Sequence, residues 1–128
     1  MPEVNPKLFR EICDTLFALG IPAHVSGYDY LINALTRVIN DPTYLRAVTS
    51  RLYPDVAEDT GSTPQRVERS IRNAIEIGFS RCDVDLLTGY FGSAIDNSKG
   101  KTTNSEFIAT AAQRIKLKLG IIPELTKL

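Results

Sequence analysis

Apolar side chains recur at helical spacing through almost the whole sequence, and this pattern limits the fold more than any other feature. In residues 5–20, leucine, isoleucine and phenylalanine fall three or four positions apart, which places them on one face of a helix. No segment alternates apolar and polar residues for long, as half-buried strands do. The sequence therefore predicts an all-α fold.

Prolines, glycines and capping residues divide this pattern into separate helices. Asn5 and Pro6 suit the start of the first helix, and Gly20 suits its end. Ser26 is predicted to cap the second helix. Five further segments are expected. The first begins at Pro42, the second runs from Pro54 to Gly61, and the third runs from Pro64 to about Phe79 after a cap at Ser62 or Thr63. The fourth follows Asp83 as far as Gly92, and the fifth runs from Asn104 or Ser105 to Leu119.

Composition describes an ordinary globular chain. Of the 128 residues, 43% are apolar and 23% are charged, with a formal net charge of zero, so the chain has the balance of a folded domain. We expect one domain over residues 1–119 and a short tail over 120–128. No N-terminal signal-peptide pattern and no apolar run near the ~20 residues of a membrane span is visible, so a cytoplasmic protein without a membrane partner is predicted.

The sequence contains little that suggests catalysis or cofactor binding. Cys13 and Cys82 are far apart and in no pair motif, so both are expected to be reduced thiols. His24 is the single histidine, and the acidic residues lack the spacing of a calcium loop. No nucleophile stands beside a base in any known pattern. We therefore expect no enzyme activity, no metal and no cofactor.

Residues 53–79 have the proportions of a helix-turn-helix. A short helix ends at Gly61, a tight turn follows, and a longer helix begins at Pro64. Val56 and Ala57 of the first helix can pack against Val67 and Ile71 of the second. That packing turns the opposite face of the second helix outward. The residues on this outward face are Gln65, Arg66, Arg69, Arg72 and Asn73, with Glu68 at its edge.

This outward face has the chemistry of a DNA-reading helix. Arginine binds guanine N7 and O6, glutamate accepts from cytosine N4, and asparagine or glutamine pairs with adenine. Residues near the start of such a helix reach deepest, so Arg66 and Arg69 are predicted to contact bases and Arg72 phosphate. The backbone N–H groups from Ser62 to Gln65, including that of Thr63, are predicted to bind a phosphate at the positive end of the helix dipole.

The zero net charge conceals an uneven distribution. Between residues 61 and 81, four arginines face two glutamates, and between 99 and 118 five basic residues face one glutamate. The segment 53–61 is acidic instead. A solvated arginine face, with Glu68 and Arg72 as an ordinary i,i+4 pair, explains part of this pattern. A non-DNA module that docks an acidic protein on the basic helix face is the alternative function.

Three longer motifs resemble one family. They are "TPQRVERSIRNAIEIGFSRCD" followed by "FG", then "GKTTNSEFIATAAQRIKL", and "LGIPAHVSGYDYL" near the start. Together they resemble the DNA-binding effector domain of the sporulation initiation response regulators, the stage-zero A protein family, from about Leu16 to Leu117. The resemblance implies a compact bundle of about six helices and a transcription regulator that binds TGTCGAA-like boxes. Family members also carry a receiver domain, whose strand–helix pattern is not seen in this sequence.

The resemblance also assigns residues to roles. It places Arg66, Glu68 and Arg69 on base edges, and Asn73 where the family commonly has histidine. It places Lys99, Lys101 and Ser105 near phosphate. The family's contact with RNA polymerase sigma factor maps to residues 81–91, from which Arg81, Asp83, Leu87 and Phe91 are predicted to form the surface. The family's last helix pairs two domains on tandem boxes, so a homodimer on DNA is expected.

Overall fold

Helix α1 (Pro6–Ala18) shows how closely the local signals set the helix ends in this computed structural model. The side chain of Asn5 accepts a hydrogen bond from the Leu8 backbone N–H at 2.8 Å, and Pro6 occupies the first turn. Gly20 follows the helix with a φ of 79°, a left-handed conformation that favours glycine. The structure describes residues 3–92 and 101–121.

The remaining elements are also helices. They are α2 (Ser26–Asn40), the 3₁₀ helix η1 (Pro42–Arg46), the π-helix η2 (Val48–Leu52), α3 (Tyr53–Thr60), α4 (Pro64–Arg81), α5 (Val84–Phe91) and α6 (Asn104–Leu119). The predicted all-α fold is confirmed: six α-helices make up the described part of the chain, together with the two short turns of η1 and η2. Helix α4 extends two residues beyond the predicted end at Phe79.

The predicted cap of α2 is wrong. Ser26 is the first helical residue, and Val25 takes the cap position with an extended backbone and no side-chain hydrogen bond. The packing of α2 explains the shift, because Gly27 is buried directly against the Ser70 carbonyl of α4. That contact places the start of α2 irrespective of which side chain could cap it.

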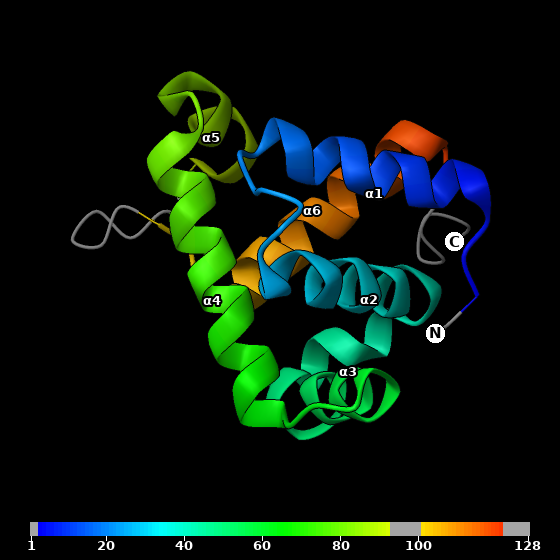
Figure 1. Cartoon of the computed structure of the whole chain (residues 1–128). Coiled ribbons are helices and arrows are strands. Elements are labelled where there is room, and N and C mark those ends of the chain that lie inside the picture. The colour runs from blue at the N-terminus through cyan, green and yellow to red at the C-terminus, as the bar shows by residue number, and fades with distance from the viewer. Residues whose placement is uncertain (1–2, 93–100, 122–128) are drawn as a thin grey trace.

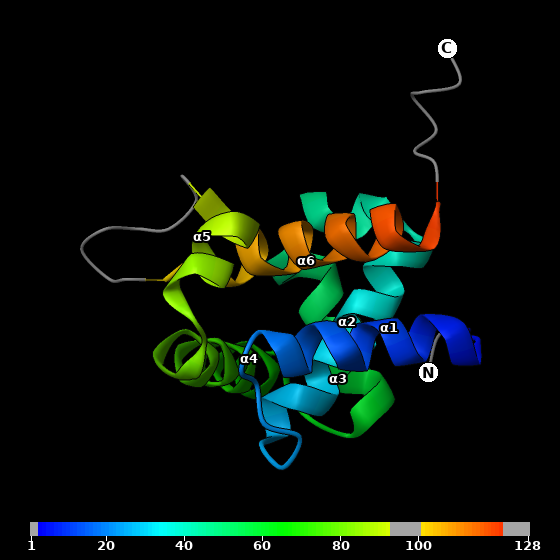
Figure 2. The ribbon, with the colours of Figure 1, turned by 90° about the horizontal axis from the view of Figure 1, so that it is seen from above.

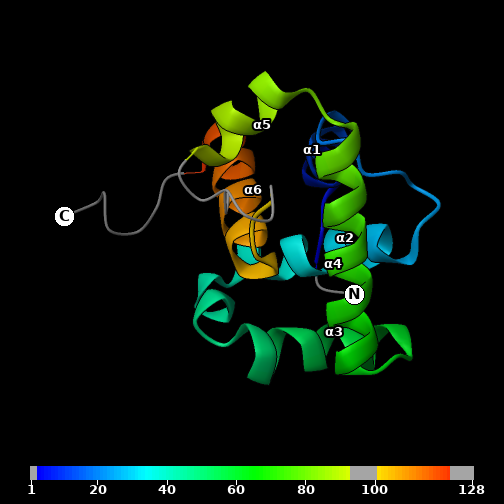
Figure 3. The ribbon, with the colours of Figure 1, turned by 90° about the vertical axis from the view of Figure 1, so that its left-hand side faces the viewer.

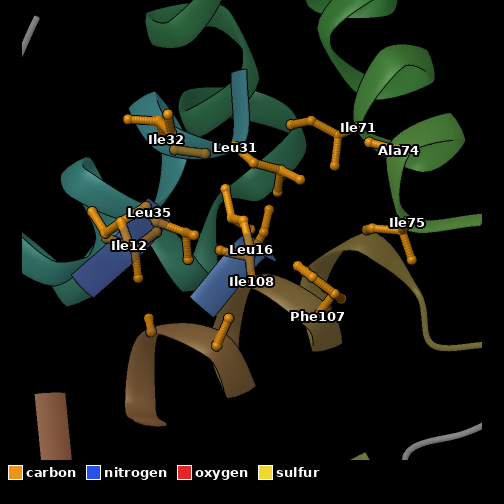
Figure 4. Close-up of a cluster of buried hydrophobic side chains, with 14 of the residues drawn as sticks. Ile12, Leu16, Leu31, Ile32, Leu35, Ile71, Ala74, Ile75, Phe107 and Ile108 are labelled. Carbon is orange, nitrogen blue, oxygen red and sulfur yellow. The ribbon is translucent and has the colours of Figure 1, made fainter. Parts of the chain in front are cut away.

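Helix α2 forms the centre of the molecule. Every residue from Leu31 to Thr36 is buried, because α1, α4 and α6 surround this helix (Figure 1). Figure 4 shows side chains of α1, α2, α4 and α6 meeting in one cluster, among them Leu16, Leu35, Ile71 and Phe107. Burial of each such side chain contributes roughly 1.5–3 kcal/mol. This shared core holds α4 in place along its inner face.

Polar bonds fix α2 to α3. Asn33 donates to Asp59 Oδ2 at 2.6 Å and accepts from Arg37 Nε at 2.8 Å, and Arg37 Nη2 lies 3.5 Å from Asp59 Oδ2. On the other side of the molecule, α1 and α6 run alongside each other (Figure 2), with Lys118 Nζ 3.2 Å from Glu11 Oε1. The bonds between α2 and α3 help to hold α3 at the N-terminal end of α4, while α5 lies at the C-terminal end of α4 (Figure 1).

Candidate nucleic-acid interface

A three-residue turn sets the start of α4. Gly61 ends α3 with a φ of 66°, and Ser62 N donates to the Ala57 carbonyl at 2.9 Å. Thr63 then caps α4, accepting from Arg66 N at 3.2 Å, and Pro64 occupies the first turn. The predicted turn, cap and start of this helix are confirmed.

Helices α3 and α4 pack together as a helix-turn-helix. Val56 and Ala57 of α3 and Val67 and Ile71 of α4 are all buried in the same core. Figure 3 shows the full length of α4 with α3 across its lower end and the start of α6 beside its middle. The inner face of α4 is therefore bound to the protein over most of its length, and the outer face remains open to a ligand.

The outer face of α4 carries the predicted reading residues. Gln65, Arg66, Arg69, Arg72 and Asn73 are exposed, whereas Glu68 is half-buried. Among the residues that the structure describes, Arg66 and Arg69 form no ion pair. Two unpaired arginines thus stand about one turn apart at the start of an exposed helix.

The other cations near this face are paired. Arg72 Nη1 lies 3.2 Å from Glu68 Oε1, which is the i,i+4 pair expected from the sequence. Lys101 Nζ lies 2.8 Å from Glu76 Oε1 and donates a hydrogen bond to it. This bond lowers the pKa of the Glu76 carboxyl below its usual range. The Glu76–Lys101 pair links α4 to the residues just before α6.

The predicted row of free N–H groups at the start of α4 needs correction. The N–H of Ser62 is used within the turn, and Pro64 has none. The side-chain hydroxyls of Ser62 and Thr63 offer donors in place of the missing N–H groups. Ser62 Oγ accepts from the Tyr30 hydroxyl at 3.1 Å and Thr63 Oγ1 accepts from Arg66 N, so the O–H of each can still donate.

The start of α6 differs from the sequence prediction. Thr103, rather than Asn104 or Ser105, is the cap, and its reciprocal bonds with Glu106 complete a capping box. Asn104 is used elsewhere: its side-chain amide donates to the Tyr53 hydroxyl and to the Glu68 carbonyl, both at 3.1 Å. Ser105 is exposed beside it. The predicted contact Lys99 lies outside the described residues.

A cavity of about 320 Å³ separates α4 from the start of α6. Basic residues Arg72 and Lys101 line it, and so does Thr102, which is 3% exposed and whose Oγ1 has no hydrogen-bond partner among the described residues. Thr49 of η2 and Tyr53 of α3 form the far wall, and burial raises the pKa of the Tyr53 hydroxyl. Sequence analysis missed Thr49 and Tyr53 in the cavity wall and Glu76 as the partner of Lys101, because no local pattern brings these residues together.

The predicted sigma-factor surface is divided by the fold. Arg81 and Asp83 are exposed, and Asp83 caps α5. Leu87 and Phe91 are only 6% and 5% exposed, so their assignment to the outer surface is corrected. The ring centroid of Phe91 lies 5.3 Å from those of Phe79 and Phe107, and this aromatic cluster accounts for the burial.

Neither a disulfide nor a candidate metal site occurs among the described residues. Both cysteines are free thiols, as expected. Across residues 3–92 and 101–121, no group of three or more histidine, cysteine and acidic side chains could hold a metal ion. Within the same ranges no helix is both long and apolar enough to cross a membrane.

Comparison with protein-family models identifies the family to which this chain belongs. Residues 12–115 match the model described as the sporulation initiation factor Spo0A C terminal. The match includes all of α2, α3, α4 and α5, and most of α6. It therefore contains the helix-turn-helix, the exposed arginines and the cavity at the start of α6. This chain belongs to the family of Spo0A C-terminal domains, which are DNA-binding regulatory domains of sporulation.

Proposed function

We propose that the N-terminal half of α4 enters the major groove of TGTCGAA-like boxes and reads their bases through Arg66, Glu68, Arg69 and Asn73. The observation that carries the proposal is the exposure of Arg66 and Arg69 in the first turns of α4, a helix whose other face is buried. Neither arginine forms an ion pair among the described residues. The major groove admits one α-helix, and an arginine fork binds guanine in two places.

Phosphate contacts on either side of α4 would hold it in the groove. Ser62, Thr63 and Gln65 lie at the start of α4, and Arg72, Lys101 and Ser105 line the cavity or its edge. Lys99 is proposed for the same role from its place in the sequence. These contacts add affinity without selecting a sequence, because every nucleotide carries the same phosphate.

Binding of labelled duplexes, one with the box and one scrambled, tests this assignment. Arg69→Ala should lower affinity for the box by about 1–3 kcal/mol and reduce discrimination between the duplexes. Lys101→Ala should weaken both duplexes alike and flatten the dependence of log K on log salt by about 0.9. Arg10→Ala, an exposed arginine on α1, is the matched control. If Arg66→Ala and Arg69→Ala both leave box binding unchanged, the assignment is wrong.

Two partner contacts complete the proposal. Exposed Arg81 ends α4 and exposed Asp83 caps α5, where the family's sigma-factor surface maps, so Arg81→Glu should reduce transcription activation while DNA binding stays intact. Leu117 on α6 is 61% exposed and lies between two lysines, which suits a contact between two domains on tandem boxes. Leu117→Asp should then remove cooperative binding to paired boxes. Equal binding of box and scrambled duplexes would instead favour the protein-docking module.

A further inference from the structure

Two carboxylates of α4 neutralise the two cations that line the cavity. Glu68, Arg72 and Glu76 are four residues apart and so lie along one side of the helix. Glu68 binds Arg72 at 3.2 Å, and Glu76 binds Lys101 at 2.8 Å. A phosphate that reaches the cavity therefore meets cations that already have anionic partners.

The Glu76–Lys101 pair is the more constraining of the two. The Lys101 side chain is 19% exposed, so its ammonium has few positions in which to meet both a carboxylate and a solvated anion, whereas Arg72 is 49% exposed. The Glu76 carboxylate is charged at neutral pH, as an ordinary glutamate is, and its hydrogen bond from Lys101 lowers its pKa further. A phosphate bound to Lys101 would either displace this carboxylate or stand beside a second negative charge.

We propose that Glu76 is a positioning residue that competes with DNA phosphate for Lys101 and thereby limits affinity for DNA of any sequence. The inference rests on the proposed phosphate contact of Lys101. Phosphate is the same at every step of the duplex, so the competition lowers binding to box and non-box DNA by the same factor. Discrimination by Arg66 and Arg69 is left unchanged, because neither arginine is paired with Glu76.

Glu76→Gln tests the proposal, since it removes the charge and keeps the length of the side chain. Binding of the full chain to box and scrambled duplexes is measured by fluorescence anisotropy at several salt concentrations near 0.1 M. The variant should bind both duplexes roughly two- to five-fold more tightly, as expected for the loss of one weak exposed pair. The slope of log K against log salt should steepen by up to about 0.9.

A double-mutant cycle assigns the tighter binding to Lys101. In a Lys101→Gln background the same change should have no effect, because the cation for which Glu76 competes is gone. Asp14→Asn on α1 removes one exposed negative charge elsewhere and should leave affinity unchanged. Thermal unfolding of each variant establishes that it is folded.

The outcomes separate this inference from the proposed function. Unchanged or weaker binding by Glu76→Gln overturns it, and so does an equal increase in affinity in the Lys101→Gln background or in Asp14→Asn. Loss of discrimination between the box and scrambled duplexes would contradict the base-reading assignment instead. In that case a parallel increase in affinity for both duplexes would still support the role of Glu76.

Discussion

Gly27→Ala should destabilise this protein, although alanine is the better helix former. Gly27 is the second residue of α2, where a Cβ would stand 2.7 Å from Ala74 Cβ and closer still to the Ser70 carbonyl oxygen. Carbon atoms pack at about 3.5–4.0 Å, so α2 and α4 would have to separate by roughly 1 Å. The backbone of α4 cannot turn aside as a side chain can.

The expected magnitude follows from two opposing terms. Alanine in place of glycine favours a helix by about 1 kcal/mol. Overpacking a tight core costs about 1–3 kcal/mol, and the separation also weakens the packing of neighbouring buried residues such as Ile71. We expect a net loss of about 1–2 kcal/mol, with the larger values favoured because the clash is with backbone. With an m-value of ~2 kcal/mol/M, the urea midpoint falls by roughly 0.5–1 M.

Urea unfolding of the full chain measures this effect, and Gly89→Ala is the control. Gly89 lies in α5, where a Cβ would meet nothing within 4 Å, so this substitution should stabilise by up to about 1 kcal/mol. DNA affinity gives a second readout, because a shift of α4 strains the Asn104 bond to the Glu68 carbonyl. If Gly27→Ala is as stable as the wild type while Gly89→Ala is stabilised as expected, the close approach of α2 and α4 is wrong.

Three further predictions test the other elements near the interface. Thr103→Ala should cost about 1 kcal/mol in urea unfolding, since it removes the cap of α6, and an unchanged midpoint would contradict the capping box. Phe91→Ala should lower the free energy of unfolding by about 3–5 kcal/mol. Val84 is 72% exposed, so Val84→Ala should change it by no more than about 0.5 kcal/mol; equal effects would refute the burial of Phe91. In an NMR titration the Glu76 carboxyl should show a pKa below its usual value and return toward it in Lys101→Gln. Because the pKa of Glu76 is lower in the folded state, the stabilisation by the Glu76–Lys101 pair is complete above the unfolded pKa of ~4.3 and is lost as the pH falls through the folded pKa. A Glu76 titration midpoint that does not change in Lys101→Gln would refute the pairing.

The helix ends that sequence predicted well are those that depend on local chemistry. Gly61 adopts a positive φ, Thr63 (one of the two expected caps, with Ser62) caps the next helix, and Pro64 begins it. Each of these choices is decided within a few residues, by steric limits on φ and by one orphan N–H. The helix-turn-helix could be predicted for this reason.

The start of α6 was assigned wrongly from the sequence, although Thr103 followed three residues later by Glu106 is a local capping-box signal. Thr103, Asn104 and Ser105 are adjacent, and all three residue types can cap a helix. Tertiary contacts reinforce this local choice, because the Tyr53 hydroxyl and the Glu68 carbonyl bind the Asn104 side chain and so keep it from capping. Nothing near residue 104 in the sequence indicates partners that lie 36 and 51 residues away.

The burial of Leu87 and Phe91 in α5 was missed because their partners are distant in the sequence. A helix of eight residues contains few repeats of its apolar pattern, so its inner face is poorly defined by sequence. Phe79 at the end of α4 and Phe107 in α6 decide it, since both rings lie against Phe91. The cavity posed a similar problem, because its walls come from η2, α3, α4 and the start of α6.

Zero net charge is compatible with selective DNA binding because the interface holds two kinds of cation. Arg66 and Arg69 form no ion pair within the described residues, so a base that binds to them displaces only water. On the proposed mode of binding, Arg72 and Lys101 would exchange a carboxylate for a phosphate, which would yield a smaller net increase in affinity. On the proposed mode of binding, affinity for any duplex stays low while the difference between duplexes is set by the unpaired arginines. Selectivity then depends on how the charges are paired, and a chain with no excess of positive charge can still discriminate.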